Sequence, residues 1–110
     1  MLQTIKYKKE IQTKLAKRLL DMLILQMLNR KPMHGYQIIT ETRKDYGVYC
    51  GPSKIYPLLA TLEKKGYLNS TWSMTTDKPR KIFSITTVGK NTLKFTEDSL
   101  NNICKNLKAP

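Results

Sequence analysis

Apolar residues in the first part of the chain recur at the three- and four-residue spacing of an amphipathic helix. The pattern predicts one helix over about residues 5–29, which ends before the pair Lys31-Pro32. Nearly every position over residues 19–28 is apolar, so we expect that half of the helix to be buried on most sides. The Lys-rich half before it should keep one solvated face.

Proline and glycine separate two further helices along the chain. A helix over residues 33–46 would start after Pro32 and stop at Gly47, because proline suits a helix start and glycine suits the position after a helix end. The next helix would begin with Ser53 as its N-cap and end at Gly66. Pro57 falls in its first turn, where proline removes at most the first intrahelical hydrogen bond. The inner face carries apolar residues at positions i, i+3, i+4 and i+7: Ile55, Leu58, Leu59 and Leu62.

The period of the pattern changes after Gly66. Leu68, Trp72 and Met74 fall on one side of an alternating run, as in a half-buried strand, and residues 82–86 form a second β-rich run. The segment between them, residues 75–81, is polar and basic and favours a turn. Together these segments predict a two-stranded hairpin with a basic tip.

Residues 87–107 predict a long final helix. Leu93, Leu100 and Leu107 are seven residues apart, and Ile103 lies between the last two. Two heptads are too short for an independent coiled coil but suffice for a helix that packs against a partner chain. The alternative is that these residues cover the core of their own chain.

The order of elements is therefore helix, helix, helix, hairpin, helix. This is the layout of a winged helix-turn-helix, so we expect a mainly α fold with a small two-stranded β wing and an additional C-terminal dimerisation helix. Residues 1–18 would form a basic N-terminal helical extension, residues 19–87 the DNA-binding domain, and residues 88–110 the dimerisation helix.

The charge of the chain favours a polyanionic partner. Twenty Lys and Arg residues against 8 Asp and Glu residues give a formal net charge of +12. A field of this sign attracts nucleic acid or an anionic membrane, although it also serves solubility. In a winged domain the second helix of the turn motif enters the major groove, and here that is the helix from Ser53. Basic or hydroxyl-bearing side chains on its outward face and at the hairpin tip are Lys54, Tyr56, Lys78, Arg80 and Lys81.

Each of these candidates also has a simpler interpretation. Lys54 and Lys64 could be ordinary solvated charges, and Tyr56 could pack at the edge of the core. A basic hairpin tip is often only a soluble turn. The DNA-binding interpretation depends on the coincidence of a basic helix face with a basic loop, since these are the two elements that a winged domain presents to DNA.

Several spaced motifs resemble those of the PadR-like transcriptional regulators. Residues 20–28, LDMLILQML, are similar to the family's first helix, and residues 32–39, PMHGYQII, to its P-x-H-G-Y-x-I signature. Residues 53–68, SKIYPLLATLEKKGYL, resemble the recognition segment with Tyr-Pro-Leu-Leu at its centre. Trp72 falls where many members have a wing tryptophan, and residues 78–81, KPRK, are similar to the basic wing tip. The resemblance spans about residues 19–93.

The resemblance implies a double-stranded DNA partner. It also implies a homodimer that is joined through the terminal helices, binds a pseudo-palindromic operator and usually represses transcription. The residues expected to contact DNA are Tyr36, Ser53, Lys54, Tyr56, Thr61, Lys64, Lys78, Arg80 and Lys81. Those expected at the dimer interface are Ile11, Leu15, Leu93, Leu100, Ile103 and Leu107. For Tyr36 the alternative to a phosphate contact is packing under the wing.

Two features depart from the family pattern. Ser53-Lys54-Ile55 stands where members often have Gly-Thr-Leu. Because Lys54 adds a positive charge to the reading face, the operator of this chain cannot be inferred from that of another member. The C-terminal helix has Phe95 but no tryptophan, so the binding of flat aromatic drugs between C-terminal helices is not expected. No other residue pattern supports a small-molecule effector.

No residue pattern indicates an enzyme, a metal site or a cofactor. His34 is the only histidine, so it is expected to pack or to cap a helix start, and Gly35 beside it would permit a close helix approach. Cys50 and Cys104 match no metal-ligand spacing. Cys104 lies beside the predicted dimer seam and is expected to be a reduced, buried thiol, with an intersubunit disulfide as the alternative.

We expect the chain to work in a reducing prokaryotic cytoplasm, associated with the nucleoid. It shows no signal-peptide pattern, and its apolar run over residues 22–25 is far too short to span a bilayer. The leading hypothesis is a sequence-specific repressor, and the first alternative is a non-specific architectural or chromatin protein. A membrane-surface protein is disfavoured because its basic segment lacks an aromatic-rich apolar face; that segment contains Lys6, Lys8, Lys9, Lys14, Lys17 and Arg18.

Overall fold

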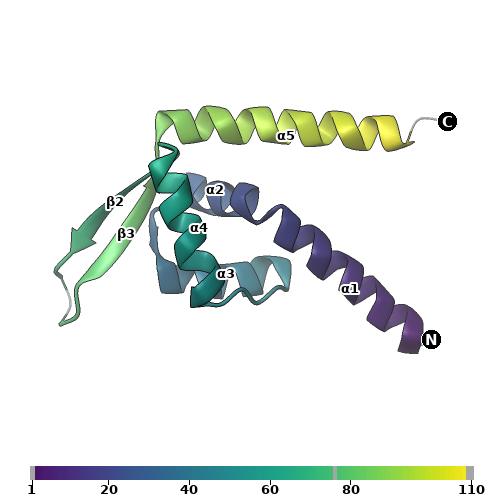
Figure 1. Ribbon diagram of the computed structural model, residues 1–110, viewed down its shortest axis with the longest axis horizontal. Helices are drawn as coiled ribbons and strands as arrows, with labels where there is room; N and C mark the ends of the chain where they lie inside the picture. The colour runs from purple at the N-terminus through teal and green to yellow at the C-terminus, as the bar shows by residue number, and fades with distance from the viewer. Residues whose placement is uncertain (1, 76, 109–110) are drawn as a thin grey trace.

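The computed structural model describes residues 2–75 and 77–108, over which the chain forms five helices and a three-stranded antiparallel sheet of order β1-β3-β2. The elements in chain order are α1 (Leu2–Arg18), α2 (Leu20–Arg30), β1 (Met33–His34), α3 (Gly35–Tyr46), α4 (Pro52–Lys64), β2 (Leu68–Ser73), β3 (Arg80–Ile85) and α5 (Thr87–Lys108). Helices α2, α3 and α4 lie together beside the sheet, and the β2–β3 hairpin projects from one side of them (Figure 1). Helices α1 and α5 extend from the other side as two separate arms.

The single long helix predicted at the start of the chain is wrong, because the structure divides it at Leu19. This residue has φ −99° and ψ 13°, outside the helical range, although the Leu19 amide still bonds to the Leu15 carbonyl at 3.0 Å. The amino-acid pattern gives a physical reason for the division. Helix α2 is apolar on most sides and buries seven of its eleven residues, whereas α1 is largely exposed and polar. The change of direction carries α1 away from the core (Figure 1).

The second predicted helix starts two residues later than expected, at Gly35, because Met33 and His34 form a short strand. In this strand Met33 pairs with Phe83 and His34 with Ile82, both on β3. The sheet therefore has a third strand beyond the predicted two-stranded wing. Two residues are too few for an alternating pattern, so β1 can be recognised only when β3 lies beside it. Gly47 ends α3 in the left-handed conformation with φ 69°, which confirms its predicted role.

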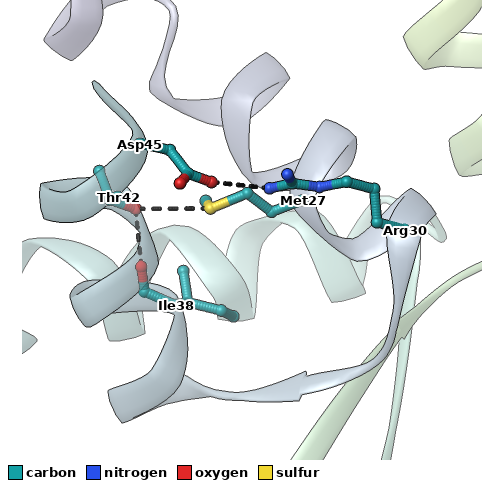
Figure 2. Close-up of polar contacts among 5 residues, drawn as sticks. All are labelled: Met27, Arg30, Ile38, Thr42 and Asp45. Atoms are coloured by element: carbon teal, nitrogen blue, oxygen red, sulfur yellow. Dashed lines mark hydrogen bonds and ion pairs between the residues drawn. The ribbon is translucent and has the colours of Figure 1, made fainter.

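Helices α2 and α3 are joined by buried packing and by an ion pair at the surface (Figure 2). The hydroxyl of Thr42, a fully buried residue, donates to the Ile38 carbonyl at 2.7 Å and lies 3.9 Å from the sulfur of Met27. Because that hydroxyl bonds to its own helix, its burial leaves no unsatisfied donor. At the outer edge, Arg30 on α2 approaches Asp45 on α3 at 2.9 Å. These contacts fix α3, and with it the helix-turn-helix, on the buried helix α2.

Helix α4 begins at Pro52 with Gly51 as its N-cap, so the predicted cap at Ser53 is wrong. The Gly51 carbonyl accepts hydrogen bonds from the amides of Lys54 and Ile55 at 3.0 and 2.9 Å. Proline suits the first helical position since its missing N–H needs no partner there. Pro57 now lies inside the helix rather than in its first turn, where its ring nitrogen cannot bond to the Ser53 carbonyl. The helix nevertheless continues to Lys64.

The hairpin packs on the core only at its base. Leu68 and Phe83 are buried, but Trp72 and Met74 are 66% and 71% exposed, so the expected half-buried strand is wrong beyond its first residues. The outer half of the hairpin projects past the helices, which leaves no surface to cover those side chains (Figure 1). At the other end of the sheet, Gly89 lets α5 approach the Tyr67 carbonyl so closely that a Cβ there would lie 2.2 Å from its oxygen. This contact anchors the start of α5 to the winged domain.

Candidate nucleic-acid interface

Helix α4 separates its residues into a buried and an exposed face. Ile55, Leu59 and Leu62 are buried and hold the helix on the core. The opposite face is open to solvent and carries five of the predicted DNA-contacting residues, which are Ser53, Lys54, Tyr56, Thr61 and Lys64. The helical period therefore brings these side chains onto one surface, as the sequence predicts.

Tyr56 combines the two interpretations left open by the sequence. Its ring lies against Gly35 at the start of α3, and a Cβ at Gly35 would be only 2.5 Å from the Tyr56 Cε1 atom. Tyr56 is nevertheless 47% exposed, and the neighbouring Tyr36 is more exposed still. Gly35 thus permits the predicted close approach of α3 and α4, and it does so by making room for an aromatic ring. Tyr56 is both packed and presented to solvent.

His34 links the helix-turn-helix to the wing. Its Nδ1 atom accepts a hydrogen bond from the Gln37 amide at 3.1 Å, which confirms the predicted capping role. Its Nε2 atom lies 2.9 Å from a guanidinium nitrogen of Arg80 on β3. Burial and, after it, the charge of Arg80 lower the pKa of His34, so its ring favours the neutral form. No sequence pattern indicates the contact with Arg80, because the two residues meet only through the β1–β3 pairing.

Arg80 and Lys81 have different surroundings although they are adjacent at the wing. Successive residues of a strand point to opposite faces of the sheet. The Lys81 ammonium lies 3.5 Å from a Glu63 carboxylate oxygen and 5.5 Å from the centre of the Phe83 ring. The hydrogen bond from Ser70 and the charge of Lys81 hold the pKa of Glu63 below its usual value, despite the opposing effect of burial. Lys81 therefore ties β3 to α4, whereas Arg80 faces His34.

Two grooves with basic linings flank the exposed face of α4. The first, which we call the wing groove, has a volume of about 650 Å³ and lies between the starts of α3 and α4 and the hairpin; its lining includes His34, Tyr36, Tyr56, Trp72, Lys78 and Arg80. The second, which we call the junction groove, has a volume of about 380 Å³ and lies where α1 meets α2; its lining includes Lys17, Arg18, Asp21, Ser53, Lys54 and Thr61. Sequence reasoning placed His34, Lys17 and Arg18 outside the DNA-contacting set.

The predicted dimer residues fall into two groups. Leu93 is buried in the core of its own chain, and Leu100 is half-buried against that core. Ile11 and Leu15 on α1 are exposed, as are Ile103 and Leu107 on α5, at 56% and 79%. Cys104 is exposed in the single chain, whereas Cys50 is buried. The apolar stripe of α5 thus continues past the end of the core.

The described part of the chain contains no helix that is long and apolar enough to cross a membrane. In the same residues, no three His, Cys, Asp or Glu side chains gather closely enough to hold a metal ion.

Comparison with known proteins identifies the family of the chain. The sequence matches the family model of the transcriptional regulator PadR-like family over residues 24–95. The fold is similar to that of a PadR family transcriptional regulator from Eggerthella lenta DSM 2243, with a TM-score of 0.81 and 28% identity over 97% of this chain and 94% of the other. A search of curated proteins found no significant match.

Two further solved structures agree with this assignment. A PadR family transcription regulator from hypervirulent Clostridium difficile R20291 has a TM-score of 0.73 and 26% identity over 79% of this chain and 92% of that one. A transcriptional regulator from Clostridium thermocellum has a TM-score of 0.72 and 26% identity over 89% of this chain and 100% of that one. The resemblance predicted from the sequence motifs is therefore confirmed. The chain belongs to the PadR-like family, whose members are DNA-binding transcriptional regulators and not enzymes.

Proposed function

We propose that the chain is a homodimeric repressor that binds a pseudo-palindromic operator in double-stranded DNA with α4 in the major groove. The observation that carries the proposal is the position of α4, whose exposed polar face lies between the wing groove and the junction groove. A major groove is about 12 Å wide, admits one helix and has a sugar-phosphate strand on either side. A polar helix face with basic side chains on both flanks matches that arrangement.

The side chains on this surface suit two different tasks. Lys54 and Tyr56, near the start of α4, would meet base edges, and Lys54 can donate to guanine or to a phosphate. Ser53, Thr61 and Lys64 lie along the same exposed face and would set the register of the helix. Contacts with the backbone or the minor groove beside the wing would come from Tyr36, Lys78, Arg80 and Lys81.

The proposed dimer would use the exposed apolar side chains of the two arms. Ile11 and Leu15 on α1 and Ile103 and Leu107 on α5 have no core of their own to cover. Burial against a second copy removes such side chains from water, and a two-fold dimer presents two reading helices to two half-sites. In this proposal residues 1–18 form an N-terminal extension, residues 19–87 the DNA-binding domain and residues 88–110 the dimerisation helix. The protein would act on the prokaryotic nucleoid.

Binding to the region upstream of the chain's own gene tests the proposal. Fluorescence anisotropy at physiological salt should give an affinity at least about tenfold higher for that region than for a random duplex of equal length. A footprint should then show two half-sites related by a dyad, and a promoter fusion should be silenced when the protein is added. A preference below about tenfold contradicts the proposal.

The net charge of +12 favours one alternative, a non-specific architectural protein. Such a protein would bind random and upstream duplexes with equal affinity and equally steep salt dependence, because phosphate contacts carry no sequence information. The comparison of the two duplexes therefore separates the alternatives.

A further inference from the structure

His34 is held between a helix start and the wing by both of its ring nitrogens. Nδ1 lies 3.1 Å from the Gln37 amide nitrogen, and Nε2 lies 2.9 Å from the Arg80 guanidinium. The first contact caps α3, and the second lies at the edge of the wing groove, which both His34 and Arg80 line. The ring thus has a fixed position and orientation next to the exposed face of α4.

The protons of this arrangement do not balance. A neutral imidazole has one N–H group and one acceptor nitrogen, and a guanidinium has only donors. If Nδ1 accepts from the Gln37 amide, the proton must be on Nε2, where it points at an N–H of Arg80. If instead Nε2 accepts from Arg80, the proton on Nδ1 points at the Gln37 amide. Either tautomer leaves two donors facing each other, and protonation of the ring leaves a donor at both nitrogens.

An anionic acceptor at the wing groove would satisfy both donors. The cap of α3 favours the Nε2–H tautomer, because an uncapped helix start leaves a backbone amide without a partner. The Nε2–H group and the Arg80 guanidinium then form a pair of adjacent donors, one of them charged. Lys78 and Lys81 also line the groove, and no acidic side chain does so in the described part of the chain. Glu63, which pairs with Lys81, is not part of the lining.

We propose that His34 Nε2–H and the Arg80 guanidinium together bind one phosphate of the DNA backbone at the wing groove. The inference rests on the proposed function, since it takes DNA as the source of the phosphate, and it adds a residue to the interface. The Tyr56 ring, which packs on Gly35 beside His34, places this phosphate next to the reading face of α4. Because one imidazole both caps α3 and donates to the phosphate, the contact also holds the helix-turn-helix at a fixed distance from the backbone.

Nuclear magnetic resonance of the imidazole nitrogens tests the proposal directly. The chain has a single histidine, so its ring signals need no assignment. At pH 7.5 the free protein should show the Nε2–H tautomer. A random 20-base-pair duplex should shift the Nε2 signal and slow the exchange of its proton, because a phosphate contact does not depend on sequence. An Nδ1–H tautomer in the free protein, or a ring unchanged at saturating duplex, overturns the proposal.

Substitutions separate the donor from the helix cap. His34→Ser keeps an oxygen that can cap α3 but has no group that reaches Arg80, so it should fold normally and lose about tenfold or more in affinity for every duplex. His34→Asn keeps both a capping oxygen and an N–H donor and should recover part of that loss. Asn101→Ser, an exposed change on α5, serves as the matched control. Unchanged affinity of His34→Ser, with thermal melting that confirms its fold, overturns the proposal.

The outcomes distinguish this inference from the proposed function. A ring that responds to random duplex in a protein with no operator preference supports the phosphate contact and contradicts the repressor. Operator preference in the wild type, together with unchanged affinity of His34→Ser for both operator and random duplex, supports the repressor and contradicts the phosphate contact. A response to millimolar inorganic phosphate but not to duplex would identify a site for free anions and overturn the assignment to DNA. Absence of binding to any duplex overturns both.

Discussion

At the scale of single residues, the proposed interface contains side chains that serve the fold and remain available to a ligand. Tyr56 fills the space above Gly35 and is still about half exposed to solvent. His34 caps α3 and reaches the wing. Such residues are difficult to classify from sequence, because packing and binding predict the same residue types. Lys54 is simpler: it is exposed on the reading face, and no ion-pair partner is found for it in the described residues.

Lys54 and Tyr56 should determine which bases are preferred. Lys54→Ala and Tyr56→Phe should each reduce the ratio of operator to random-duplex affinity by about tenfold, because one specific base contact is worth about 1–3 kcal/mol. The dimer should stay intact in both variants. Anisotropy on the two duplexes, with light scattering for the mass, measures both effects. Full specificity in both variants would remove α4 from its assigned role.

The lowered pKa of His34 predicts that acid weakens the fold. Burial and the Arg80 charge disfavour the protonated ring in the native state, so below about pH 6.5 the unfolded chain takes up the proton first. The free energy of unfolding should therefore fall between pH 7.5 and 5.5. Glu63, with a lowered pKa, contributes its stability above about pH 4.5 and loses it only below that value, outside this window.

Urea unfolding at pH 7.5, 6.5 and 5.5 measures this dependence. His34→Ser has no titrating group at this position and should show a flat profile over the same range. An equal slope in the wild type and in the variant would mean that another group causes the loss.

At the scale of elements, the structure assigns different surroundings to residues that the sequence treats as one group. Arg80 and Lys81 both belong to the basic wing tip, but β3 turns them to opposite faces of the sheet. Both side chains line the wing groove, but Lys81 is partly neutralised by Glu63, whereas Arg80 lies against His34. The junction groove likewise exists only because α1 departs from α2 next to α4.

Removal of the two wing charges should therefore have unequal effects. Arg80→Ala should reduce the slope of log affinity against log salt by about 0.9, the value for one phosphate contact. Lys81→Ala should reduce it by less, because its ammonium already has a carboxylate neighbour. Titrations from 50 to 200 mM salt on a random duplex compare the variants with Lys90→Ala, an exposed change on α5. Identical slopes for wild type and Arg80→Ala would place the wing away from DNA.

The junction groove should contact the phosphate strand opposite the wing. Lys17 and Arg18 are exposed there, next to Lys54, and Asp21 supplies the one negative charge of the lining. The double change Lys17→Ala with Arg18→Ala should weaken binding to every duplex and reduce the salt slope by between one and two units. The control Lys8→Ala with Lys9→Ala removes the same charge from the outer part of α1. Equal effects of the two pairs would indicate general attraction rather than a local contact.

At the scale of the whole molecule, one chain leaves its two arms incomplete. Helix α5 packs on α2, and Leu100 is half-buried against the core, whereas Ile103 and Leu107 beyond it are exposed. The last part of α5 extends away from the core (Figure 1). The apolar residues Ile11 and Leu15 on α1 are likewise exposed and cover no part of the core. A domain with a formed core and exposed apolar residues on both arms has the surface that the proposed dimer would bury.

Charges placed on the stripe of α5 should separate the subunits. Ile103→Glu with Leu107→Glu should give a monomer with a native circular dichroism spectrum, because neither side chain contributes to the core of its own chain. Affinity for a single half-site should change little, while affinity for the complete operator should fall by about a hundredfold or more through loss of the second contact. Analytical ultracentrifugation gives the mass, and Asn101→Glu on another face of α5 is the control. A dimer that survives the double change would place the interface elsewhere.

The elements of this protein could be predicted from sequence because their signals are local. The spacing of Ile55, Leu59 and Leu62 predicts one buried face of α4, and Gly47 ends α3 as expected. The errors occur where local signals are weak or compete. Gly51-Pro52 caps α4 ahead of Ser53, β1 is too short to have a period, and the apolar pattern crosses Leu19 without a break.

The sequence by itself determined that residues 20–28 are helical and largely buried, that three further helices follow, and that a basic hairpin precedes the last of them, since each of these features depends on residues within a few turns of one another. Only the tertiary structure decided which side chains meet across those elements. His34 reaches Arg80, 46 positions away, through the pairing of two strands, and Tyr56 meets Gly35 through the crossing of two helices. Contacts of this kind depend on how the elements pack. The spacing of polar and apolar residues along the chain reports only local structure, so it cannot predict them.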